Sequence, residues 1–112
     1  MMRVGQVIGM VPEKIEEYKR LHSDGSAESA IIRPILRAHN FHNFNIYITK
    51  LDDGKDYLFA FYEYTGDDYE KDNADLMSIP EYHHWLSMTD PCQKPLAGYE
   101  SWKHMEQVYY EP

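Results

Sequence analysis

The chain has 112 residues, enough for one domain with a modest hydrophobic core and too few for two. It carries 19 acidic and 11 basic residues, and the resulting net charge of −8 repels phosphate backbones and anionic membrane surfaces. We therefore expect a single domain over residues 1–112 that binds neither nucleic acid nor a membrane.

The first residues lack the apolar run of a signal peptide, and no stretch reaches the length needed to span a bilayer. The single cysteine, Cys92, cannot form an internal disulfide, which fits a reducing compartment. The sequence therefore predicts a cytoplasmic protein.

The first third of the chain predicts a strand followed by an interrupted helix. Val4 to Met10 is an apolar, β-branched run, and Pro12 follows it where prolines commonly begin a helix. Residues 23–26 break this helix. An apolar helical pattern resumes around Pro34, which we expect either to begin a new segment or to kink the helix.

The rest of the chain predicts a hairpin, two short helices and a closing strand. The expected ranges are strands at 41–49 and 57–64 around a turn at 52–55, helices at 66–77 and 80–88, and a strand at 102–110. The order strand, helix, strand, strand, helix, strand is the ferredoxin-like (βαββαβ) arrangement, an α+β fold with helices on one face of an antiparallel sheet. The uncovered face predicts a homodimer.

One helical pair is suited to proton transfer. Tyr18 and His22 lie one helical turn apart and therefore project from the same side. An imidazole with a pKa near 6.5 can donate or accept a proton near neutral pH. The alternatives are that His22 only interacts with the carbonyls at a helix end and that Tyr18 is a core residue.

The chain resembles the L-rhamnose mutarotase family over nearly its whole length. Four segments carry the resemblance, in the same order as in the family: Glu16 to His22 (the Glu-Tyr-x-x-x-His helix), His42 to Tyr47 (the Asn-Tyr-x-Ile strand), Trp85 with Met88 to Asp90 (the Trp-x-x-Met helix), and Glu106 to Tyr110 (the closing strand).

The resemblance implies a ferredoxin-like domain that dimerises face to face into an αβ barrel and interconverts the α and β anomers of a pyranose without a cofactor. It implies that His22 is the catalytic proton donor and that Tyr18, Asn43, Phe44, His84 and Trp85 bind the sugar.

Two positions depart from the family pattern. Phe44 stands where the family usually has Tyr, and His84 stands where a Trp is usual. Because a site that bonds a given hydroxyl discriminates against sugars lacking it, these changes can move specificity. L-rhamnose or a related 6-deoxy sugar is the leading candidate substrate.

The chemistry requires no metal, since ring opening needs one acid and one base. His39 and His42 lie three residues apart, but no Cys or His pair recurs at a zinc-motif interval, so we expect no metal site. Two alternatives to a mutarotase remain. One is another enzyme on the same dimeric barrel, such as a cofactor-free monooxygenase or a haem-handling protein, and the other is a non-catalytic sugar-binding or regulatory module.

Overall fold

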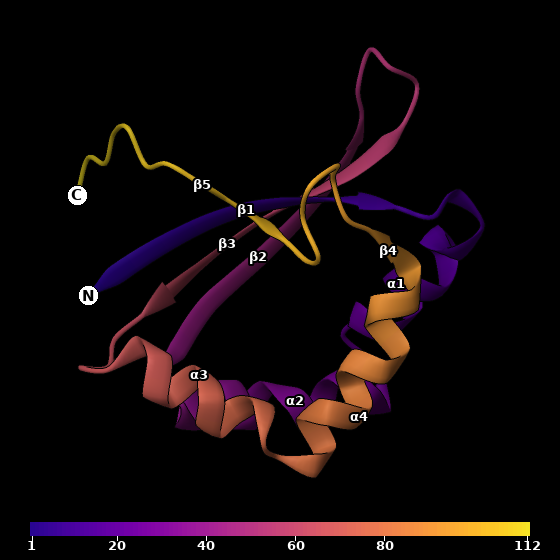
Figure 1. The fold of residues 1–112 in the computed structure, drawn as a ribbon. Helices are drawn as coiled ribbons and strands as arrows, with labels where there is room; N and C mark the ends of the chain where they lie inside the picture. The colour runs from indigo at the N-terminus through magenta and orange to yellow at the C-terminus, as the bar shows by residue number, and fades with distance from the viewer.

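A curled antiparallel sheet arches over four α-helices in the computed structural model, which covers residues 1–112 (Figure 1). The helices all lie on the concave side of the sheet. In chain order the elements are β1 (Met2–Met10), η1 (Pro12–Lys14), α1 (Ile15–His22), α2 (Ala27–Ala38), β2 (Phe41–Lys50), β3 (Asp56–Tyr64), α3 (Tyr69–Met77), α4 (Pro80–Thr89), η2 (Asp90–Cys92), β4 (Gln93–Lys94) and β5 (Lys103–Met105).

The strand order confirms the ferredoxin-like prediction. The sheet runs β2-β3-β1, and every strand pair is antiparallel. On the free edge of β1 two short strands share the place of one closing strand: β4 pairs at Gly9 and Met10, and β5 pairs at residues 5–7. The predicted hairpin and the two predicted short helices are all present.

The predicted strand at 102–110 is much shorter than expected. Only Lys103–Met105 pairs with β1, and the residues after it continue as an extended segment (Figure 1), with the Tyr110 ring 3.5 Å from the Arg3 guanidinium. Val108 and Tyr109 are 87% and 77% exposed there. Their strand-forming side chains matched a strand pattern, but no neighbouring segment of the same chain offers a hydrogen-bonding partner.

The helix α2 continues unbroken through Pro34, so the prediction of a new segment at that residue is wrong. The helix begins instead after Ser26, whose hydroxyl accepts a hydrogen bond from the Ser29 amide at 2.8 Å. This N-cap stabilises the start of the helix, while Pro34 costs only one intrahelical bond. The interruption between α1 and α2 was correctly predicted.

Alternate residues divide the sheet into an inner face and an outer face. After the first residue of each strand, the residues of β1 and β3 with even numbers, among them Ile8, Leu58 and Ala60, are buried beneath the helices. Residues with odd numbers point the other way, where no helix covers them; the Tyr110 ring lies over Arg3 on this side. Phe61 on β3 and Tyr47 on β2 are 48% and 61% exposed on that outer face.

A glycine in β1 allows β4 to approach closely. A Cβ atom on Gly9 would lie 2.6 Å from the Lys94 carbonyl oxygen, which is a backbone atom and cannot rotate aside. We expect Gly9→Ala to lower the free energy of unfolding by about 1 to 3 kcal/mol, measured by urea denaturation. Gly25→Ala is the matched control, since nothing lies within 4 Å of its added methyl group. Equal losses in both variants would contradict the assigned clash.

Candidate active site

A cavity of about 770 Å³ lies between the inner face of the sheet and the helices. Side chains from α1, α2, α3, α4, the sheet and the segment before β5 line it. Most of the lining is aromatic or aliphatic, with a small number of polar groups among them. This is the usual composition of a pocket for a small organic molecule.

His22, the last residue of α1, is fixed by the backbone of its own helix. Its Nδ1 lies 2.7 Å from the carbonyl oxygen of Tyr18. Because a carbonyl only accepts, Nδ1 carries the hydrogen and donates it, and Nε2 is the nitrogen left to exchange protons. His22 therefore both bonds a carbonyl at the end of its helix and lines the cavity.

Aromatic rings enclose this imidazole on two sides. The Tyr18 ring lies 4.2 Å from it, centroid to centroid, and the buried Trp85 indole meets it edge-on at 4.9 Å. Desolvation by this packing lowers the pKa of His22 below 6.5, and the hydrogen bond to the Tyr18 carbonyl opposes the shift in part. His22 therefore rests neutral at neutral pH, with Nε2 as an acceptor.

Tyr18 is buried, and its hydroxyl accepts a hydrogen bond from the Gln93 amide at 3.2 Å. Burial raises the pKa of Tyr18 to about 12, against a smaller opposing effect of the Gln93 bond. The hydroxyl therefore keeps its proton and can donate it to a ligand oxygen. Tyr18 belongs both to the core and to the cavity wall.

One stripe of α4 faces the cavity. It comprises Tyr82, Trp85, Leu86 and Thr89, at helical spacing. His84 is not part of it: this exposed side chain lines a separate groove of about 410 Å³ between α2 and α4. In the structure Trp85 lines the cavity and His84 does not, because His84 lies on the side of the helix away from Tyr82 and Leu86.

A bulge in β2 separates the two neighbouring residues Asn43 and Phe44. The register shifts between His42 and Asn45, and Asn43 has a φ of 53°. Phe44 consequently turns to the inner face, where its ring stacks on Tyr62 at 4.8 Å and lines the cavity. Asn43 bonds the Glu63 carboxylate instead and does not line the cavity, so its predicted role in sugar binding stays a prediction.

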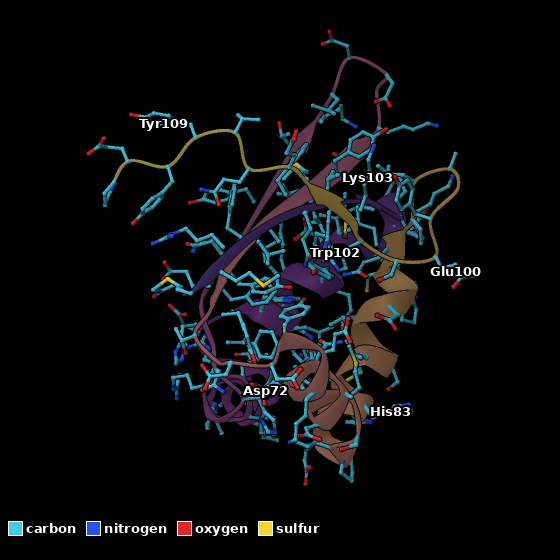
Figure 2. All side chains as sticks on the ribbon, turned by 60° about the vertical axis from the view of Figure 1, so that its left-hand side comes forward. Asp72, His83, Glu100, Trp102, Lys103 and Tyr109 are labelled. Carbon is cyan, nitrogen blue, oxygen red and sulfur yellow. The ribbon has the colours of Figure 1, made fainter.

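Several cavity residues were absent from the sequence prediction. They are Gln6 on β1, Tyr62 on β3, Asp90 at the end of α4, Gln93 on β4, and Trp102 and His104 around β5. Strand alternation could have identified Gln6, a polar residue at a buried position of an apolar strand. Trp102 lies between the C-terminal segment and the helices (Figure 2) and packs on the cluster that contains Tyr18. Its place depends on an irregular loop that no pattern predicts.

No three His, Cys, Asp or Glu side chains come together as a set that could hold a metal ion. None of the helices has the length and apolar character required to cross a bilayer.

Comparison with known proteins identifies the family. Residues 3–111 match the family model for L-rhamnose mutarotase. The chain belongs to the L-rhamnose mutarotase family. It is 28% identical over 99 residues to an L-rhamnose mutarotase of Ligilactobacillus salivarius (strain UCC118), a match that covers 86% of this chain and 89% of that protein. L-rhamnose mutarotases are carbohydrate isomerases, and this chain is an enzyme of that class by its family.

Solved structures agree on the fold. An L-rhamnose mutarotase from Formosa agariphila superposes with a TM-score of 0.69 at 17% identity, with both chains covered completely. A putative antibiotic biosynthesis monooxygenase from Nitrosomonas europaea gives a TM-score of 0.55 at 16% identity, covering 96% of this chain and 100% of the other. The mutarotase family therefore shares its fold with proteins of other described activities.

The lowered pKa of His22 predicts a pH dependence of stability. Folding favours the neutral imidazole, so the unfolded chain binds more protons between the lowered folded pKa and 6.5, and stability rises with pH across that window. We expect the gain between pH 5 and 7 to shrink in His22→Gln, measured by urea denaturation at each pH. An unchanged pH slope would show that His22 has the same affinity for protons in both states.

Proposed function

We propose that this protein is a mutarotase that interconverts the α and β anomers of a pyranose, L-rhamnose or a related 6-deoxy sugar. The observation that carries the proposal is the position of His22. Its free Nε2 is available in a cavity that also presents the Tyr18 hydroxyl and the Trp85 indole. Family membership and the name of the Ligilactobacillus salivarius relative support L-rhamnose as the first sugar to test.

The proposed reaction moves two protons and breaks one bond. One group removes the proton of the anomeric hydroxyl while another delivers a proton to the ring oxygen, so the C1–O5 bond breaks and an aldehyde forms. Rotation about C1–C2 and reversal of both transfers close the ring as the other anomer. His22 performs one transfer through Nε2, since Nδ1 is occupied by the Tyr18 carbonyl.

The remaining cavity side chains bind and orient the sugar. Tyr18 offers a hydroxyl donor whose proton is retained at neutral pH. Trp85 gives an apolar surface to the C–H side of the ring. The stacked pair of Phe44 and Tyr62 forms an apolar wall, which suits the methyl group of a 6-deoxy sugar better than a hydroxymethyl group.

We also propose that two copies associate through their outer sheet faces as a homodimer. That face exposes Tyr47 and Phe61, and half-buried Phe59 lies beside them on β3. Exposed aromatic clusters of this kind are typical of protein interfaces. The extended C-terminal segment, whose Val108 and Tyr109 contact water in the single chain, is available to the same partner.

Replacement of His22 tests the catalytic proposal. We expect His22→Gln to lower enzymatic anomer exchange of L-rhamnose by about 10² or more, since general acid–base assistance is removed. Exchange is measured by NMR saturation transfer between the α and β anomeric signals, after subtraction of the spontaneous rate. Saturation transfer to the sugar without exchange between anomers in the wild type would instead identify a binding module.

His39→Gln is the matched control for this experiment. His39 follows the end of α2 and makes the same type of bond, from Nδ1 to the carbonyl of Ile35 at 2.8 Å, but it does not line the cavity. We expect this variant to retain the wild-type exchange rate. A folded His22→Gln variant with the rate of the control would reject His22 as the proton-transfer residue.

A charge on the outer face tests the dimer. We expect Phe61→Lys to shift the sedimenting species from twice the chain mass to 13.3 kDa, because a buried unpaired ammonium destabilises an interface. Ile31→Lys is the control, since Ile31 is comparably exposed, at 54%, but lies on α2. A wild-type protein that sediments at 13.3 kDa at micromolar concentration would refute the dimer itself.

A further inference from the structure

We propose that the carboxylate of Asp90 is the second proton-transfer group of this cavity and acts on the sugar together with His22. The inference rests on the proposed mutarotase function and supplies the partner that ring opening requires. Neither the resemblance to the family nor its sequence pattern assigns a role to this residue.

Asp90 continues the cavity-facing stripe of α4. Trp85 and Leu86 form one turn of that stripe, Thr89 and Asp90 form the next, and all four line the cavity. The Asp90 amide bonds the Leu86 carbonyl, so the residue keeps helical geometry as the first residue of η2. Asp90 therefore lies beside Leu86 at one edge of the stripe, and the indole that contacts His22 lies at the opposite edge.

Tyr18 contacts the imidazole and lies close enough to Asp90 for the carboxylate charge to contribute to its raised pKa. The helix α1 packs against η2, and Tyr18 belongs to the same buried cluster as Cys92 of η2. On its other side the Tyr18 ring contacts His22 at 4.2 Å. The two titratable groups thus reach the cavity from different elements, His22 from α1 and Asp90 from η2.

Asp90 is a carboxylate without a partner in the chain. No hydrogen bond or ion pair within the structure involves its side-chain oxygens, whereas Arg33, the cationic guanidinium at the cavity, pairs with Asp24 at 3.2 Å. The Tyr62 and Tyr69 hydroxyls likewise bond each other, at 2.5 Å. Asp90 is an exposed residue of the cavity lining, and its carboxylate is free to accept a proton from a ligand.

The local electrostatics support this role. Desolvation raises the pKa of Asp90 above 3.8, and the charge of His83 opposes the shift in part. Burial raises the pKa of Tyr82 to about 12, with a further contribution from the Asp90 charge. The pKa values of Asp90 and His22 are thus closer to each other than the ordinary values of 3.8 and 6.5.

The step balances with these two groups alone. The Asp90 carboxylate takes the proton of the anomeric hydroxyl, the C1–O5 electron pair moves to O5, and protonated His22 gives the proton at Nε2 to O5. The opposite assignment, with neutral His22 as base and protonated Asp90 as acid, involves the same total number of protons and gives the same pH–rate profile. Closure of the ring returns both protons.

The test compares Asp90→Asn, Asp90→Glu and Glu81→Gln in the L-rhamnose exchange assay between pH 3.5 and 8. In the wild type we expect a bell-shaped kcat profile, which falls on the acid side as Asp90 is protonated and on the alkaline side as His22 is deprotonated. Asp90→Asn should lower kcat by about 10² and remove the acid limb, with KM changed only a few fold. Asp90→Glu should restore the acid limb.

Glu81→Gln controls for the loss of one negative charge from α4, because Glu81 lines the outer groove and not the cavity. It should keep both limbs. The groups that can also titrate around Asp90 are Tyr18 and His22 from α1, Tyr82 and His83 from α4, and His104 from β5, so His104→Gln is measured in parallel.

The outcomes separate this inference from the proposed function. An active wild type together with an Asp90→Asn variant that folds and keeps its rate and acid limb would overturn the role of Asp90. Loss of the acid limb in His104→Gln and not in Asp90→Asn would also overturn the role of Asp90. It would assign the second proton transfer to His104 on β5. A wild type that exchanges no anomers of any sugar would overturn the mutarotase function itself.

Discussion

The apolar inner face of the sheet must be buried beneath the helices. The division of this buried surface into separate clusters determines where the cavity lies. The buried apolar residues form three clusters instead of one. Val4 and Ile8 belong to two of them, and Gln6, between the two on the same strand, lines the cavity. Hydrophobic burial around the cavity therefore supplies the free energy that keeps a space of about 770 Å³ open at the centre. A side chain such as Tyr18 or Trp85 stabilises the fold and forms the site with the same atoms.

The elements with strong local signals were predictable from the sequence, as was the strand order. The hairpin has a polar turn between two β-branched and aromatic runs, and the α1 to α2 break has a Ser-Asp-Gly-Ser segment. The proximity of Tyr18 and His22 follows from helical spacing alone. Sequence patterns are weakest where a rotation by one residue decides which side chain faces the cavity. A bulge reverses the direction of Asn43 relative to Phe44, and the phase of a short, weakly amphipathic helix decides between His84 and Trp85. Trp102 and His104 reach the cavity by tertiary packing, for which the sequence carries no local signal.

The uneven distribution of aromatic residues connects the fold to its proposed assembly. Ten Tyr, four Phe and two Trp exceed what one small core can bury. Some, such as Phe41 and Tyr64, pack against each other at one end of the sheet, at a centroid distance of 5.3 Å. Others remain exposed on the outer face, where they offer apolar area to a second copy. The single chain thus leaves apolar surface unburied on the side of the sheet opposite the cavity. Association through that surface would leave the cavity accessible to a sugar.

The bond between the His22 imidazole and the Tyr18 carbonyl has a consequence for the complete reaction cycle. It reserves one ring nitrogen permanently, so a proton can enter and leave the ring only at the other nitrogen, on the cavity side. In an isomerisation the product anomer contains the same atoms and the same protons as the starting anomer. A residue with a single exchangeable position therefore recovers its initial state when the sugar recloses, without help from bulk water. The enzyme would be ready for either anomer after each turnover, and neither direction of the reaction would require a separate step to restore the protonation state of His22.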